Sequence, residues 1–169
     1  ILCPSRERPK NLERLINNLN KFTHERERIE LLVYVDNDDP LVDEYNKINS
    51  NYINEKNKII FKLHIGEPKS VSKSWNDIAK ISTGDVFIMG NDDFIFETKG
   101  WDEILDKEVA KFSDNIFVIW FNDGLRAHMY GDFPIVSRKW CEILGYFTPG
   151  CFEFTFNDTW IIDLGRRVK

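Results

Sequence analysis

The chain has 169 residues, of which 42% are hydrophobic and 30% charged, and its formal net charge is −5. This is enough apolar material for one domain with a buried core, and the negative charge argues against a dedicated nucleic-acid-binding protein. No apolar stretch reaches the ~20 residues of a membrane-spanning helix, and the first residues do not resemble a signal peptide.

The cysteines indicate a reducing environment. Cys3, Cys141 and Cys151 are odd in number and lack the C-x-x-C spacing of a zinc site. Disulfide bonds are therefore not expected, and a cytoplasmic location fits this cysteine usage better than a secreted one.

Apolar runs and helical spacing alternate along the first half of the chain. A short strand over 1–5 precedes a helix that begins near Pro9, a residue suited to the first helical turn. The run ELLVYVD predicts a strand buried on both faces. The elements expected over this half are strands at 1–5, 30–36, 58–65 and 85–90, and helices at 9–22, from Pro40 to about 48, and at 70–81.

The second half continues the alternation less regularly. We expect a helix at 100–112, a strand at 115–121, a strand at 132–138, a short helix at 139–144 and a last helix capped by Asp158. Strands separated by amphipathic helices predict an α/β fold, with a mostly parallel central sheet flanked by helices, in a single domain over residues 1–169.

Unusual polar residues follow three of the expected strands, as PSRER, DNDD and GNDD. In open α/β sheets, ligands bind beyond the carboxyl ends of the strands. Mg²⁺ or Mn²⁺ held between carboxylates and substrate phosphates would explain the two acidic clusters. The alternative is that these Asp and Asn residues only form turns and helix caps.

Three segments in this order, PSRERPKNLERLINNL, LLVYVDNDDP and SVSKSWNDIAKISTGDVFIMGNDDFIF, carry a family resemblance. Together they resemble the nucleotide-sugar glycosyltransferases of GT-A fold, in the inverting family 2-like group. The resemblance spans roughly residues 2–165. It implies a GT-A-like, Rossmann-like fold and a nucleoside-diphosphate-sugar donor.

The resemblance assigns the nucleotide pocket to the ends of the first two strands. Pro4, Ser5 and Arg6 would line the pocket for the base and the phosphates. Asp36 would hydrogen-bond the base or the ribose, with Asp38 close by.

Further roles fall on residues after the third strand. Lys73 and Asn76 would face the nucleotide. Asp92 would contact the ribose or the metal, Asp93 would bind Mn²⁺ or Mg²⁺ under the diphosphate, and Asp158 would be the catalytic base. Residues 1–93 would thus bind the donor, and residues 94–169 would bind the acceptor and carry the base.

The sequence departs from the family pattern at three positions. Gly90 stands where many members have the first Asp of the DXD motif, Asn157 replaces a Glu, and Trp75 stands where Arg is common. These changes concern metal affinity, tuning of the base and diphosphate binding, respectively. Asp123 and His128 are further candidates for contacting the acceptor or the metal.

The implied activity is metal-dependent transfer of a sugar to a hydroxyl acceptor with inversion. The acceptor could be a glycan, a protein or a modified nucleic acid, and the small size suits a bacterial or virus-encoded enzyme. One alternative is a sugar-phosphate nucleotidyltransferase, although PSRERP lacks the glycine-rich loop typical of that class. Another is a degenerate transferase that binds a nucleotide or a glycan without turnover.

Overall fold

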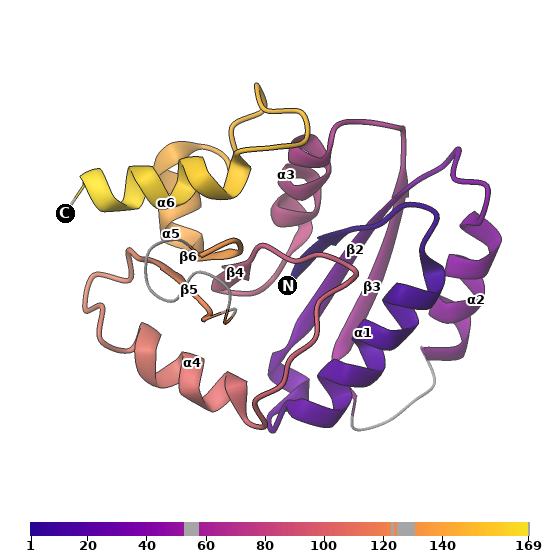
Figure 1. Ribbon diagram of the computed structural model, residues 1–169, viewed down its shortest axis with the longest axis horizontal. Helices are drawn as coiled ribbons and strands as arrows, with labels where there is room; N and C mark the ends of the chain where they lie inside the picture. The colour runs from indigo at the N-terminus through magenta and orange to yellow at the C-terminus, as the bar shows by residue number, and fades with distance from the viewer. Residues whose placement is uncertain (53–57, 123, 125–130, 169) are drawn as a thin grey trace.

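The computed structural model describes residues 1–52, 58–122, 124 and 131–168, and strands and helices alternate from β1 to β5 (Figure 1). The strands are β1 (Leu2–Pro4), β2 (Glu30–Asp36), β3 (Ile60–Gly66), β4 (Val86–Ile88), β5 (Val118–Trp120) and β6 (Pro134–Ser137). The helices are α1 (Pro9–Phe22), α2 (Val42–Tyr52), α3 (Val71–Ile81), α4 (Trp101–Val109), α5 (Arg138–Leu144) and α6 (Asn157–Arg167), with a short 3-10 helix, η1 (Arg26–Arg28).

The strands pair in two groups. β1, β2 and β3 form a parallel sheet in that order, with Pro4 beside Tyr34 and Asp36 beside Gly66. A single parallel bridge between Leu2 and Met89 joins the end of β4 to β1. β6 lies between β4 and β5 and is antiparallel to both. The predicted α/β fold with a parallel sheet is confirmed, and β6 adds an antiparallel region that the sequence pattern does not predict.

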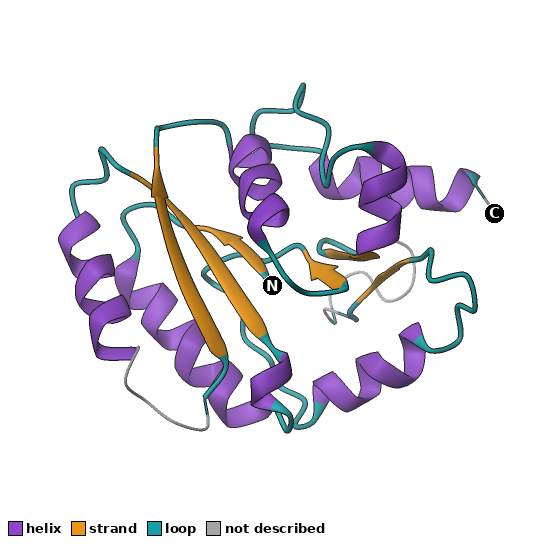
Figure 2. Cartoon of the chain, turned by 180° about the vertical axis from the view of Figure 1, so that it is seen from behind, coloured by secondary structure: helices purple, strands orange, loops and turns teal. Residues whose placement is uncertain are grey.

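β2 is buried on both faces, as its continuous apolar run predicts. Leu31, Val33 and Val35 lie in the core that includes α1, whereas Leu32 and Tyr34 lie in the core that includes α3. In the view from behind, the long strands lie in front of α1 (Figure 2). Full burial of each such side chain contributes ~1.5–3 kcal/mol, so β2 holds the two helical layers together.

Several boundaries differ from the expected ones for local reasons. α2 begins at Val42 and not at Pro40, because the Asp39 carboxylate accepts the backbone N–H of Leu41 and forms a turn first. The strand expected at 115–121 is reduced to β5, and the helix expected at 100–112 is reduced to α4. No helix in the described part of the chain is long and apolar enough to cross a membrane.

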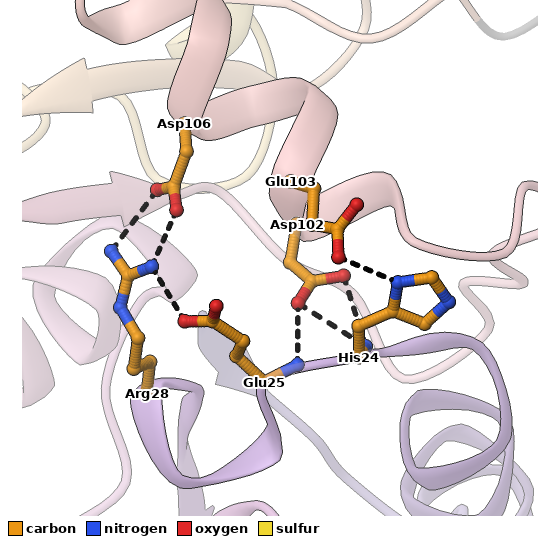
Figure 3. A network of polar contacts seen from close by, with 6 residues as sticks. All are labelled: His24, Glu25, Arg28, Asp102, Glu103 and Asp106. Atoms are coloured by element: carbon orange, nitrogen blue, oxygen red, sulfur yellow. Dashed lines mark hydrogen bonds and ion pairs between the residues drawn. The ribbon is translucent and has the colours of Figure 1, made fainter.

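A polar network fixes α4 against the turn that follows α1 (Figure 3). The carboxylate of Asp102 accepts the backbone N–H groups of His24, at 3.1 and 3.2 Å, and of Glu25, at 2.8 Å. Arg28 of η1 bonds to both Glu25 and Asp106. Because η1 leads directly into β2, this network lies at the amino end of the sheet, away from the strand ends considered next.

Candidate active site

The carboxyl ends of β1, β2 and β4 meet at one edge of the sheet. The backbone N–H of Ser5 donates to Tyr34 of β2 at 2.9 Å, and that of Gly90 donates to Leu2 of β1 at 2.8 Å. Side chains then connect the three ends, since Ser5 reaches Asp92 and Arg6 reaches Asp36. The structure thus brings together four of the predicted site residues, at the edge where α/β proteins bind their ligands.

Asp92 is fully buried, with 0% of its surface exposed. Its Oδ2 accepts a 2.7 Å hydrogen bond from the Ser5 hydroxyl, and its Oδ1 lies 3.3 Å from Nη1 of Arg8. Burial raises the pKa of Asp92, while the Ser5 hydroxyl, the Arg8 charge and nearby Asn11 act in the opposite direction. Within the described residues, Oδ1 accepts no hydrogen bond. A buried carboxylate oxygen without a hydrogen-bond donor is costly, so a bound ligand or cation at Oδ1 would be stabilising.

Tyr45 is a site residue that the sequence pattern does not reveal. The sequence pattern predicts Tyr45 as an inward-facing residue of the second helix, and the side chain is fully buried. Its hydroxyl, however, lies 2.8 Å from the Ser5 hydroxyl and accepts the backbone N–H of Arg8 at 2.9 Å. Tyr45 therefore belongs to the hydrogen-bonded group around Asp92.

Arg6 connects two predicted acids. Its Nη1 donates to Oδ2 of Asp36 at 2.7 Å and to Oδ1 of Asp38 at 2.6 Å. The Asp36 side chain is 14% exposed and that of Asp38 is 53% exposed. Asp36 is thus held in place at the end of β2 while part of its surface stays open to a ligand.

Asp39 is buried and was not singled out from the sequence. Besides its bond to Leu41, its carboxylate accepts the backbone N–H of Glu7 at 2.7 Å. Glu7 has a φ of 57°, a left-handed conformation that a residue with a side chain adopts only at a cost. Asp39 therefore stabilises the bend that carries Arg6 and Arg8 over the strand ends.

Two departures from the family pattern have a packing explanation. A Cβ added to Gly90 would lie 2.9 Å from the backbone oxygen of Leu2 and 2.7 Å from a methyl group of Ile1, so the contact between β1 and the end of β4 leaves no room for an aspartate. The indole N–H of Trp75 donates to the backbone oxygens of Leu2, at 3.1 Å, and of Gly90, at 3.3 Å. Trp75 thus fastens α3 to the same junction.

The two predicted residues on α3 differ in their contacts. The Lys73 side chain is exposed. The Asn76 amide donates to the backbone oxygen of Thr148 at 2.8 Å and accepts the backbone N–H groups of Phe147 and Thr148 at 2.9 and 3.0 Å. Asn76 fixes the 147–148 segment against α3, and nucleotide binding by either residue stays a prediction.

Asp158 is not the cap of the last helix, which corrects the sequence interpretation. α6 begins at Asn157, and its N-cap is Phe156, whose φ is 68°. Asp158 is the second residue of the helix and only half-buried. The preceding Asn157 is buried and accepts a 3.0 Å bond from the Ser72 hydroxyl of α3. The start of α6 is therefore anchored to the first turn of α3, which follows the carboxyl end of β3 (Figure 1).

The residues of this site fit a metal that substrate phosphates help to bind. No group of three or more His, Cys, Asp or Glu side chains in the described ranges could hold a metal ion alone. The Asp92 carboxylate, whose Oδ1 lies 3.3 Å from the exposed Arg8 guanidinium, and the exposed carboxylate of Asp93 nevertheless offer the one or two carboxylates that Mg²⁺ and Mn²⁺ typically use beside phosphates. Asp123 and His128 lie outside the described residues.

The family model described as glycosyl transferase family 2 matches residues 1–132. The chain belongs to this family. A search of curated protein sequences found no significant match.

Solved structures of similar fold include two proteins crystallised with nucleotide sugars. One is the mannosyltransferase PcManGT from Pyrobaculum calidifontis in complex with GDP-Man and Mn²⁺, with a TM-score of 0.73 and 12% identity over 92% of this chain and 48% of that one. Another is TarS 1–349 from S. aureus in complex with UDP-GlcNAc, with a TM-score of 0.67 and 15% identity over 87% of this chain and 47% of that one. At these identities the likeness shows a GT-A fold, and this family 2 chain spans about half the length of either structure.

Proposed function

We propose that this family 2 domain transfers a sugar from a nucleoside-diphosphate sugar to a hydroxyl-bearing acceptor, with inversion and with dependence on Mn²⁺ or Mg²⁺. The observation that carries the proposal is the buried Asp92 at the strand edge where the family resemblance expects the donor, because its Oδ1 accepts no hydrogen bond from the residues that the structure describes. A metal held by Asp92 and Asp93 would supply Lewis-acid stabilisation to the departing nucleoside diphosphate.

The nucleoside would bind beside this position, at the ends of β1 and β2. Asp36 is fixed by Arg6 and partly open, which suits it to accept a hydrogen bond from a base or a ribose. Asp38 and Pro4 would border the same subsite. Lys73, exposed on α3, would contribute positive charge to the diphosphate.

Asp158 would be the general base that takes the proton of the acceptor hydroxyl. This role is supported by the Asn157–Ser72 contact, which fixes the start of α6 at the side of α3 nearest the carboxyl ends of the strands. General-base catalysis contributes typically ~10²–10⁴-fold. Residues 1–93 would thus bind the donor, and residues 94–169, including Asp123 and His128, would bind a glycan, protein or modified nucleic-acid acceptor.

A second candidate is a domain that binds a nucleotide sugar without turnover. Two substitutions favour it, because Gly90 removes the first acid of the DXD motif and Asn157 removes the Glu before the proposed base. The packing around Gly90 and the Asn157–Ser72 contact show that both residues serve the fold. Turnover therefore separates the two candidates.

The experiment is a ligand screen followed by a turnover assay. UDP, GDP, UDP-GlcNAc, GDP-Man and other nucleotide sugars are tested by thermal shift, each with Mn²⁺ and with EDTA. A ligand at ~100 times its dissociation constant stabilises the folded state by ~2.7 kcal/mol. We expect one nucleotide class to stabilise the protein with Mn²⁺ only, and its sugar conjugate to be slowly hydrolysed. Binding without any turnover would favour the second candidate, and no binding by any ligand would contradict both.

A further inference from the structure

The contacts around Tyr45, Ser5 and Asp92 favour one direction of hydrogen bonding. The Tyr45 hydroxyl accepts the backbone N–H of Arg8, and burial raises the pKa of Tyr45, so its own proton is retained and needs an acceptor. The neighbouring Ser5 oxygen at 2.8 Å provides that acceptor. The Ser5 proton is then directed to Oδ2 of Asp92 at 2.7 Å.

The same contacts make the reverse direction costly. If Ser5 donated to Tyr45, the tyrosine oxygen would receive two donors and Oδ2 of the buried Asp92 would lose its bond from Ser5. Buried polar groups without partners cost ~1–3 kcal/mol each. The backbone N–H of Arg8 therefore fixes the Tyr45 hydroxyl, Tyr45 fixes the Ser5 hydroxyl, and Ser5 fixes Oδ2 of Asp92.

The two oxygens of Asp92 therefore have different partners. Oδ2 is bound to the protein through Ser5, whereas Oδ1 lies 3.3 Å from the Arg8 guanidinium and accepts no hydrogen bond in the described part of the chain. Arg8 is held by the same tyrosine through its backbone, and its side chain is 49% exposed, so solvent can replace Asp92 as the partner of the guanidinium. Oδ1 is consequently the oxygen that an incoming cation can bind.

We propose that Tyr45 is a positioning residue of the donor site, which acts through Ser5 to orient the Asp92 carboxylate so that Oδ1 is presented to the metal. The inference rests on the proposed function, because it takes the metal-nucleotide complex as the ligand. Substitution of groups that orient metal ligands in this way typically lowers metal affinity ~10–100-fold, and we expect a loss of similar size when Tyr45 is changed.

The test measures Mn²⁺ affinity by electron paramagnetic resonance in the presence of saturating UDP or GDP, whichever binds the wild type. Tyr45→Phe removes only the hydroxyl, and we expect the dissociation constant of Mn²⁺ to rise ~10-fold or more. Ser5→Ala should produce a similar rise. The double variant should bind Mn²⁺ about as tightly as the single variant with the lower affinity, since both changes interrupt the same connection to Asp92. Ser5→Thr, which keeps a hydroxyl, should retain most of the affinity.

Tyr52→Phe is the matched control, because Tyr52 ends the same helix and its hydroxyl bonds Asn20 and the backbone of Ile59, away from Asp92. Its Mn²⁺ affinity should equal that of the wild type, even if its melting temperature falls. Equal loss of Mn²⁺ affinity in the Tyr45 and Tyr52 variants would overturn the inference, as would wild-type affinity in Ser5→Ala. If the wild type binds no Mn²⁺ with either nucleotide, the proposed function fails and this inference with it.

Discussion

The Ser5 hydroxyl donates a 2.7 Å hydrogen bond to Oδ2 of Asp92, across 87 residues of sequence. The bond connects the end of β1 with the loop that follows β4. Because Ser5 also contacts Tyr45 of α2, the acidic motif after β4 is joined to two other elements without any ligand. The candidate donor site is therefore preorganised, which reduces the ordering that binding would otherwise require.

Restoring the missing acid of the DXD motif should destabilise the protein. A side chain at position 90 would be forced against the Leu2 backbone oxygen and the Ile1 side chain. Overpacking of this kind costs typically ~1–3 kcal/mol. We expect Gly90→Ala to lower the free energy of unfolding by that amount in urea titrations, and Gly90→Asp to bind Mn²⁺ no more tightly than the wild type.

The control for this prediction is Gly150→Ala, where an added Cβ would meet no atom within 4 Å. Its stability should stay within ~0.5 kcal/mol of the wild type. A stable Gly90→Asp protein with increased Mn²⁺ affinity would show that the junction between β1 and β4 can open.

Asp102 should make a large contribution to stability at the amino end of the sheet. Asp102→Ala leaves the backbone N–H groups of His24 and Glu25 without their acceptor (Figure 3). We expect a loss of about 2–3 kcal/mol, measured by chemical denaturation. Glu103→Gln, which removes only the charge of an exposed side chain in contact with His24, should cost less than ~1 kcal/mol. Similar losses in the two variants would contradict this assignment.

Glu30 should make the protein sensitive to acid. Burial alone would raise the pKa of its carboxyl group, but hydrogen bonds from Lys62, Ser82 and Thr83 outweigh it and lower the pKa to about 2. Because the folded-state pKa lies below the unfolded value of 4.5, this stabilisation is present above pH 4.5 and is lost as the pH falls toward 2.

The stabilisation at neutral pH amounts to at most ~3 kcal/mol. Glu30→Gln should lower the melting temperature at pH 7 and flatten its dependence on pH between about 4.5 and 2. Glu27→Gln, at an exposed site nearby, should leave the pH profile unchanged. An unaltered profile in Glu30→Gln would show that other carboxylates cause the acid response.

The sequence predicts well those features that depend on neighbouring residues. Pro9 and the apolar spacing after it predict α1 with its observed bounds, and the run ELLVYVD predicts β2. The antiparallel position of β6 could not be predicted, because pairing between strands distant in sequence leaves no local pattern. The alternation of elements alone does not distinguish a fourth parallel strand from an antiparallel one.

In the candidate site, too, features set by neighbouring residues could be predicted and features set by contacts distant in sequence could not. Asp36 and Asp92 could be placed at one edge because both follow apolar strands, and the structure brings them there. Tyr45 could not be singled out, since its helical position is explained fully by burial in the core. The sequence predicts Asp158 as a cap because Asp is common at that position, but the helix starts two residues earlier, with Phe156 as the cap and Asn157 bound to Ser72.

Asp158→Asn tests the proposed base without disturbing the fold. Asp158 is not the cap of α6, and within the described residues its carboxylate accepts a long hydrogen bond of 3.5 Å from the neighbouring Thr159, so the amide should be tolerated. We expect transfer to slow by ~10²-fold or more, with unchanged donor affinity and melting temperature. Asp163→Asn, on the same helix, should keep full activity. Full activity in Asp158→Asn would assign the base to another residue.

The most direct test of the donor site is calorimetric titration of UDP and GDP into the wild type and Asp93→Asn, each with Mn²⁺ and with EDTA. The control is Asp85→Asn, because Asp85 directly precedes β4 at its amino end, whereas Asp93 follows the carboxyl end of β4. We predict that Mn²⁺ strengthens binding of one nucleotide to the wild type and to Asp85→Asn, and that Asp93→Asn loses this metal-dependent gain. Equal metal-dependent binding by all three proteins would contradict the assignment of the donor site.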